Sequence, residues 1–271
     1  MCKLPLQYGF PLAIHIVEEA IEAGTVASKT VNGVTTISFS HPKSNSLPGR
    51  LLAELAQSVR DAGLDQATSV IVICSQGKGA FCAGASFDEL ASIRDKDAGK
   101  EFFLGFARVI LAMTRCAKPI VTRVHGKAVG GGVGIVAASD YAIATENAAL
   151  RLSELAVGIG PFVVGPAIER KVGPGPFAAM ALDADWRDGH WGERHGLYSQ
   201  LCATPTDLDA AVTKTARTLS QANPTAVQRI KEIAWSGTEH WPTLLDQRAE
   251  MSGTLVLSEY TRTAIAKFVR Q

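Results

Sequence analysis

The chain has 271 residues, of which 46% are hydrophobic and 20% are charged, and its 27 Lys and Arg residues nearly balance its 26 Asp and Glu residues. This composition predicts a folded globular protein, and the balanced charge argues against an overall field that attracts nucleic acid or an acidic membrane. Five scattered cysteines without a CxxC pair argue against a disulfide framework or a zinc site, so we expect a reducing, cytoplasmic setting.

Residues 1–24 are expected to be an N-terminal appendage. They contain an apolar patch that His15 interrupts and that acidic residues follow, with no small-residue cleavage pattern. We therefore expect a short helix over 12–23 rather than a signal peptide. No apolar run approaches the roughly 18 residues needed to span a bilayer, so we expect no membrane segment.

The following residues predict alternating strands and helices. Alternation predicts a strand over 34–40, helical periodicity predicts a helix over 51–62, and a continuous apolar run predicts a buried strand over 69–74. A second unit follows as helix 99–116, strand 119–124, helix 131–139 and strand 140–145. Buried parallel strands that helices cover indicate an α/β fold.

The second half of the chain is predicted to be mainly helical. After residue 164 only residues 196–201 carry a strand signal, and Pro205, Pro224 and Pro242 mark helix starts. The expected helices span residues 165–172, 176–182, 207–221, 224–236 and 241–270. We therefore divide the chain into the appendage 1–24, a core over 25–200 and a helical region over 201–271 that packs between subunits.

Two glycine-containing segments lie between a predicted strand and a predicted helix. In the first, 77–90, Ser86 and Glu89 match a capping box and predict a helix start. The second, 126–134, contains three consecutive glycines, and glycine in a helix interior costs up to about 1 kcal/mol relative to alanine. These glycines therefore predict a close approach of the backbone to another group. Two helix N-termini that converge on one point would stabilise a developing oxyanion.

Other interpretations of the glycines are weaker. Residues 132–137 fit the dinucleotide pattern GxGxxA, but strand 119–124 ends several residues earlier and no acidic residue follows at the required spacing. Neither Gly126–Lys127 nor Gly77–Lys78 continues as a phosphate loop, and no GxSxG nucleophile elbow occurs. Close packing of helix on sheet would also account for the glycines over 130–134, although not for the first loop.

Five segments resemble, in order and spacing, the motifs of the enoyl-CoA hydratase/isomerase, or crotonase, superfamily. They are SNSL (44–47), AFCAGASFDEL (80–90), GKAVGGGVG (126–134), SELAVGIGPF (153–162) and SEYTRTAIAKF (258–268). The resemblance runs from about residue 28 to the end of the chain. It implies a crotonase-like spiral of ββα units with a C-terminal helical trimerisation region, and a homotrimer or a dimer of trimers. It also implies an acyl-CoA substrate whose coenzyme A is part of the substrate, with no separate cofactor.

The same resemblance implies catalytic residues. The thioester oxygen would lie between the backbone N–H groups of Ala85 and Gly131, so a side chain at position 131 would obstruct the thioester. Of the two glutamates in the family's hydratases, Gly134 replaces one, whereas Glu154 retains the other. Apolar neighbours should raise the pKa of Glu154. Because one carboxylate can move a proton between two carbons, an enoyl-CoA isomerase is favoured over a hydratase.

The resemblance also implies contacts to the coenzyme. Lys43 lies where a basic residue often approaches the CoA phosphates, and Phe268 matches an aromatic residue that can cover the adenine of a neighbouring subunit's ligand. Ala83, Ala85 and Phe87 complete the expected coenzyme-binding residues.

Two further positions bear on the chemistry. Ser86 replaces the aspartate that is common after AGA, which weakens any transfer of detailed substrate contacts. The six histidines have no metal-ligand spacing, so no metal is expected. His125, beside the second glycine loop, is the histidine that could supply a polar group in place of the missing glutamate.

Three classes of function follow. The first is a CoA-thioester enzyme that acts through an enolate, with isomerase and hydratase as its main subtypes and decarboxylase or C–C hydrolase as more distant ones. The second is a non-catalytic acyl-CoA-binding relative, which would keep Ala85 and Gly131 without needing Glu154. The third is a nicotinamide oxidoreductase based on GxGxxA. No nucleic-acid or membrane partner is expected.

Overall fold

A six-stranded sheet forms the centre of the computed structural model, which describes residues 23–269. Its strand order is β1-β2-β3-β4-β6-β8, and all neighbours are parallel except the antiparallel pair β1 and β2. The strands are β1 (Thr25–Val31), β2 (Val34–Ser40), β3 (Val70–Ser75), β4 (Ile120–Val124), β6 (Tyr141–Thr145) and β8 (Gln200–Cys202). The predicted α/β fold with buried parallel strands is thus confirmed, whereas nearly all of the helix expected over 12–23 lies outside the described residues.

Strand β1 was not predicted. Its residues are exposed apart from half-buried Val26, so no buried face marks it in the sequence. The available signal was the turn Asn32–Gly33, where both residues have positive φ, 49° and 80°. An Asn-Gly pair of this kind is typical of a two-residue hairpin.

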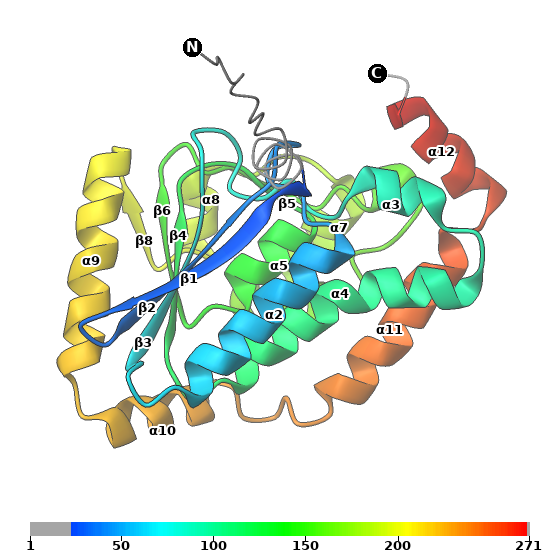
Figure 1. The fold of residues 1–271 in the computed structure, drawn as a ribbon. Coiled ribbons are helices and arrows are strands. Elements are labelled where there is room, and N and C mark those ends of the chain that lie inside the picture. The colour runs from blue at the N-terminus through cyan, green and yellow to red at the C-terminus, as the bar shows by residue number, and fades with distance from the viewer. Residues whose placement is uncertain (1–22, 270–271) are drawn as a thin grey trace, which may run out of the picture.

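Helices cover both faces of the sheet (Figure 1). On one face lie α2 (Gly49–Leu64), α4 (Lys96–Arg115), α5 (Gly131–Ala137) and α11 (Trp241–Leu255), and on the other lies α9 (Pro205–Gln221). Successive residues of β3 alternate between the two layers: Ile71 and Ile73 belong to the main core, whereas Val70 and Val72 pack with Leu208 of α9. A strand buried on both faces explains the continuous apolar run.

The remaining elements surround this core. They are α3 (Phe87–Ser92), the short sheet of β5 (Ala128–Val129) and β7 (Leu150–Arg151), the 3₁₀ turn η1 (Leu155–Val157), α6 (Gly165–Val172), α7 (Pro174–Asp183), α8 (Gly189–Arg194), α10 (Pro224–Ala234) and α12 (Glu259–Val269). Within the described range, no helix is both long and apolar enough to cross a membrane. Cys74, Cys82, Cys116 and Cys202 are free thiols.

The single helix expected over 241–270 is a wrong prediction, because the chain turns between α11 and α12. Val256 is buried in a small cluster with Val157 and Ile265, and this packing redirects the chain. The Ser258 hydroxyl then accepts a hydrogen bond from the Thr261 N–H at 3.3 Å, which caps the start of α12. As a result α12 contacts α3 and η1.

The predicted capping box at α3 is only half formed. The Ser86 hydroxyl accepts a hydrogen bond from the Glu89 N–H at 3.4 Å, as expected for an N-cap. The Glu89 carboxylate, however, accepts a hydrogen bond from the Gly49 N–H at 2.8 Å and so connects α3 to the start of α2.

Replacing Ser86 with Ala is expected to lower the free energy of unfolding by about 1 kcal/mol, because the Glu89 N–H loses its acceptor. Chemical denaturation of the two proteins measures the difference. Ser92→Ala, at the exposed end of the same helix, is the control and should change the free energy by less. Equal effects of the two substitutions would contradict a capping role for Ser86.

Candidate active site

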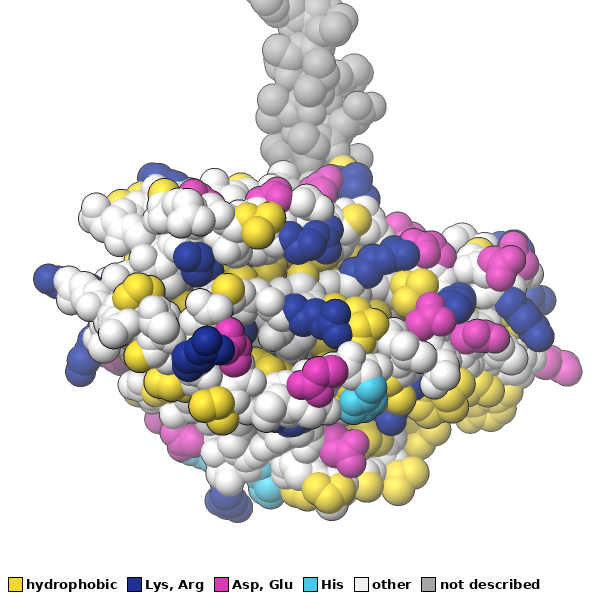
Figure 2. Space-filling view, turned by 90° about the horizontal axis from the view of Figure 1, so that it is seen from below, with side chains coloured by type: hydrophobic (Ala, Val, Ile, Leu, Met, Phe, Trp, Pro, Cys, Tyr) yellow, Lys and Arg dark blue, Asp and Glu magenta, His cyan; other side chains and the backbone are white. Residues whose placement is uncertain are grey.

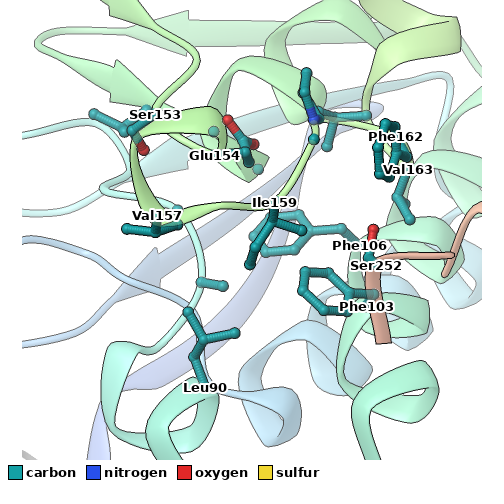
Figure 3. Close-up of a pocket in the computed structure, with 18 of the residues that line it drawn as sticks. Leu90, Phe103, Phe106, Ser153, Glu154, Val157, Ile159, Phe162, Val163 and Ser252 are labelled. Carbon is teal, nitrogen blue, oxygen red and sulfur yellow. The ribbon is translucent and has the colours of Figure 1, made fainter. Parts of the chain in front are cut away.

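A pocket of about 660 Å³, part of it open to solvent, lies between α3, α4, α5, the segment 153–164 and α11. Its wall is largely apolar and includes five phenylalanines, at positions 87, 102, 103, 106 and 162. Figure 3 shows Phe103, Phe106 and Ser252 across the pocket from Glu154. Among the described residues, Glu154 is the only titratable side chain that lines this pocket.

The two glycine loops meet at the edge of the pocket. The first loop is anchored by hydrogen bonds from the Leu47 N–H to the Gly84 carbonyl, at 2.8 Å, and from the Val129 N–H to the Cys82 carbonyl, at 2.9 Å. Gly84 has φ +90°, and a Cβ built there would lie 3.1 Å from the Val129 carbonyl oxygen and 3.7 Å from the Gly131 nitrogen. Gly84 is therefore needed for the close approach of the loops.

Ala85 and Gly131 both line the pocket, on either side of this contact. Within residues 23–269, the N–H of neither residue donates a hydrogen bond to a protein acceptor. Gly131 is the first residue of α5, so its N–H belongs to the helix turn that has no intrahelical acceptor. The structure thus brings together two unpaired backbone donors.

Glu154 is held by its own backbone at the start of η1. Its carbonyl accepts hydrogen bonds from the N–H groups of Val157, at 3.2 Å, and Ile159, at 3.0 Å. Its carboxylate lies over Gly130, where a Cβ would come within 2.9 Å of Oε1, and Gly130 has the positive φ of 51°. A residue with a side chain at position 130 would be strained and would displace the carboxylate.

The environment of the Glu154 carboxylate favours its protonated form. Oε2 is buried and has no hydrogen-bond partner among the described residues. Burial raises the pKa of Glu154 to about 7, although the backbone N–H groups of Glu154 and Ser153 lower it by a smaller amount. This pKa suits a group that accepts and returns a proton near neutral pH.

The structure adds a packing reason for glycine at position 131. A Cβ at position 131 would lie 2.2 Å from Cζ of Phe106, whose ring is buried. A side chain there would collide with this ring, whether or not a thioester is bound. Packing between α4 and α5 therefore disfavours a side chain at this position, and obstruction of a thioester stays a prediction.

Packing also occupies the position of the missing glutamate. A Cβ at Gly134 would lie 2.6 Å from Cγ1 of Val164 and 3.6 Å from Cδ1 of Ile110. A side chain there would require Val164 to move, because its Cγ1 lies too close to the added Cβ. Position 134, where the resemblance implies a second glutamate in hydratases, thus faces apolar side chains in this structure.

The other candidate residues fall into different places. Ala83 and Phe87 line the pocket. Lys43 does not line it; its ammonium is exposed and forms an ion pair with Asp88 of α3. The side chain of Phe268 lies outside the described residues.

His125 does not replace the missing acid in this pocket. It is absent from the lining, and its two ring nitrogens are buried without a hydrogen-bond partner in the described part of the chain. Burial lowers its pKa, and nearby Arg123 acts in the same direction. Among residues 23–269, no group of three or more His, Cys, Asp or Glu side chains is arranged to hold a metal.

Sequence reasoning missed the wall that faces Glu154. Phe102, Phe103 and Phe106 come from α4, and Ser252 comes from α11. The cluster of phenylalanines in the predicted helix over 99–116 was the available signal, but helical periodicity alone does not distinguish a pocket wall from the core.

Comparisons with known proteins agree with this fold. Residues 29–270 match the family model described as Enoyl-CoA hydratase/isomerase. The (7aS)-7a-methyl-1,5-dioxo-2,3,5,6,7,7a-hexahydro-1H-indene-carboxyl-CoA hydrolase of Rhodococcus jostii (strain RHA1) is 33% identical over 132 residues, which are 49% of this chain. The match spans about half of that relative, 51% of its length.

Two further proteins cover more of the chain. The peroxisomal Delta(3,5)-Delta(2,4)-dienoyl-CoA isomerase of Arabidopsis thaliana is 27% identical over 222 residues, 76% of this chain and 79% of that protein. The crystal structure of an enoyl-CoA hydratase from Bacillus halodurans superposes with a TM-score of 0.82 at 20% identity, over 89% of this chain and 99% of that one, which supports the fold alone. Because the family model extends over nearly all of the described residues, the chain belongs to the enoyl-CoA hydratase/isomerase, or crotonase, family.

Proposed function

We propose that this protein is an acyl-CoA enzyme of the enoyl-CoA isomerase type, in which Glu154 moves a proton between two carbons of the acyl group. The observation that carries the proposal is that Glu154 is the only titratable side chain lining the pocket within the described residues. The elevated pKa of this carboxyl, about 7, lets it both accept and return a proton near neutral pH.

The two backbone donors supply the second requirement. In the proposed complex the thioester oxygen accepts hydrogen bonds from the N–H groups of Ala85 and Gly131, which stabilise the negative charge of an enolate. Glu154 removes a proton from C2 of a 3-enoyl thioester, and the electron pair is delocalised onto the thioester oxygen. The same carboxylic acid then protonates C4, which leaves a conjugated 2-enoyl thioester and regenerates the carboxylate.

Hydration is the first alternative. Adding water across a double bond is easier when a second acid–base group assists, and Val164 and Ile110 fill the space next to Gly134 where such a group would stand. This packing supports isomerisation over hydration.

Hydrolysis is a second candidate, because the relative with 33% identity is a carboxyl-CoA hydrolase. Glu154 would then activate a water molecule instead of transferring a proton directly between carbons. Because the pocket wall is largely apolar, we favour the reaction that needs no water.

Several expectations belong to the proposal as well. Coenzyme A would be bound as part of the substrate, without a separate cofactor, by Lys43, Ala83, Ala85, Phe87 and Phe268. A phosphate at Lys43 would have to compete with Asp88 for the ammonium. We further propose a homotrimer or a dimer of trimers, built through the region 201–271, in the cytoplasm.

The reaction type is tested by incubating the full-length protein separately with a 3-enoyl-CoA and a 2-enoyl-CoA and following the absorbance of the conjugated thioester. Isomerisation increases this absorbance with the 3-enoyl substrate. Loss of absorbance with the 2-enoyl substrate without thiol release would indicate a hydratase, and release of free thiol would indicate hydrolysis of the thioester. Acyl-CoA binding without turnover of either substrate would contradict enoyl chemistry and favour a non-catalytic relative.

The pH dependence of the reaction should follow the ionisation of Glu154. Only the carboxylate can accept the first proton, so kcat/KM is expected to rise as the pH increases through about 7 and to level off above it. Initial rates from pH 5 to pH 9 would measure this profile. A rate that is already constant above the ordinary carboxyl pKa of 4.5 would contradict a buried Glu154 as the base.

A further inference from the structure

A second pocket, of about 930 Å³ including open solvent, lies at the opposite edge of the sheet from Glu154. It is bordered by the first residues of β4 and β6, by the end of α6 and by α10. The glycine loops of the first pocket follow the last residues of β3 and β4, and the two pockets share no lining residue. The second pocket is therefore separate from the proposed catalytic site.

Asp140 and Lys231 form an ion pair in this pocket, and both groups also have hydrogen-bond partners in the protein. Asp140 accepts hydrogen bonds from the Trp235 Nε1–H and the Ile120 N–H, both at 2.7 Å. The Lys231 ammonium lies 2.7 Å from the same carboxylate and also donates to the carbonyls of Met113 and Lys118, each at 2.9 Å. Lys231 is only 5% exposed, so its charge is matched by Asp140 within the protein.

Two further cations line the pocket, and neither forms an ion pair within residues 23–269, although the Glu239 carboxylate interacts electrostatically with Arg170. Arg170 donates to the carbonyls of Ala234 and Ser236, which are neutral acceptors. The Lys171 ammonium makes no hydrogen bond or ion pair within residues 23–269, and its Nζ lies 5.5 Å from the centre of the Trp235 ring. Burial lowers the pKa of Lys171, and Asp140 only partly opposes this effect. Asp140 is the only acidic residue of the described chain that lines this pocket.

The rest of the lining is mainly apolar and aromatic. Tyr141, Leu219, Val227, Ile230 and Trp235 face the same space as Lys171. Helix α10 runs along the lower edge of the molecule in Figure 1, and Figure 2 shows charged side chains of both signs among hydrophobic ones on the face seen from below. An apolar wall with a few placed polar groups is typical of a small-molecule site.

We propose that this pocket binds a small organic carboxylate with an apolar body. The carboxylate would accept a hydrogen bond from the Lys171 ammonium, which has no hydrogen-bond acceptor within the described residues, and would add a negative charge beside Arg170. Its apolar body would lie against Val227, Ile230 and Trp235. Charge complementarity selects this ligand class over a neutral one, because a neutral molecule would leave the ammonium without a counter-charge.

The test uses octanoate as the probe and the full-length protein. The protein is treated with acetic anhydride with and without octanoate, and acetylation of each lysine is measured by peptide mass spectrometry. Octanoate should protect Lys171 but not Lys214, which is exposed on α9 and serves as the internal control. If Lys171 is already unreactive without octanoate, or is not protected by it, the proposal fails.

Binding to matched variants decides the role of the charge. By calorimetry, Lys171→Met should weaken octanoate binding roughly tenfold or more, whereas Lys171→Arg should keep most of it. Octanol, which has the same chain without the charge, should bind more weakly than octanoate to the unchanged protein. Circular dichroism melting confirms that both variants fold. No octanoate binding, equal binding by Lys171→Met, or equal binding of octanol would each overturn the proposal.

Discussion

Replacing Glu154 with Gln is expected to reduce the rate of 3-enoyl-CoA isomerisation by roughly 10²–10⁴-fold, the usual contribution of a positioned acid–base group. Gln has nearly the same shape, so the pocket and the donors of Ala85 and Gly131 should remain in place. Acyl-CoA binding should therefore persist while turnover is lost. Absorbance of the conjugated thioester measures turnover, and calorimetry with a saturated acyl-CoA measures binding.

A matched control distinguishes the chemistry from the loss of a charge. Glu146 is an exposed glutamate that does not line the pocket, so Glu146→Gln should leave the rate unchanged. If Glu154→Gln keeps the rate of the unchanged protein, the proposal that Glu154 transfers the proton is wrong. If it loses acyl-CoA binding as well, the residue positions the ligand instead of reacting with it.

Stability supplies a readout of Glu154 that does not depend on the substrate. Burial raises the pKa of its carboxyl from 4.5 to about 7, so between these pH values the native state binds more protons than the unfolded state. The contribution of Glu154 to the free energy of unfolding therefore falls as the pH rises through this range. Glu154→Gln removes this pH-dependent contribution. The free energy of unfolding of the variant, relative to that of the unchanged protein, should therefore increase between pH 5 and pH 8. A difference that does not change with pH would contradict the raised pKa.

Replacing Gly131 with Ala should destabilise the fold by about 1–3 kcal/mol or more, the usual cost of overpacking a core. The added Cβ would lie 2.2 Å from Cζ of Phe106, and that ring is only 6% exposed. Chemical denaturation measures the loss. Gly175, also helical, is the matched control: a Cβ there meets nothing within 4 Å, so Gly175→Ala should not destabilise the protein.

The partner residue tests the stated cause. Combining Gly131→Ala with Phe106→Leu should restore part of the lost stability relative to the sum of the single changes, because the smaller side chain makes room for the Cβ. If the effects simply add, contact with Phe106 is not the reason for the glycine. If stability returns but the double variant isomerises more slowly than Phe106→Leu alone, position 131 must also be a glycine for the thioester.

Local patterns in the sequence determined much of the sheet, and the resemblance to family motifs supplied the candidate base. The apolar run at 69–74 corresponds to β3, because a strand that is buried on both faces is apolar at every position. The alternation at 34–40 corresponds to β2, because burial on one face makes every second residue apolar. Glu154 and the two glycine loops were found from motifs, which depend on the neighbouring residues along the chain. The hairpin strand β1 was missed because only its turn carried a signal.

Tertiary structure alone decided what surrounds Glu154 and what the glycines accommodate. Phe106 reaches Gly131 from another helix, Val164 fills the space beside Gly134, and Ser252 arrives from α11. The turn after α11 and the unmatched charge of Lys171 likewise depend on segments far apart in sequence. Periodicity and turn chemistry act over a few residues, whereas the space left for a side chain is set by distant elements that pack against it.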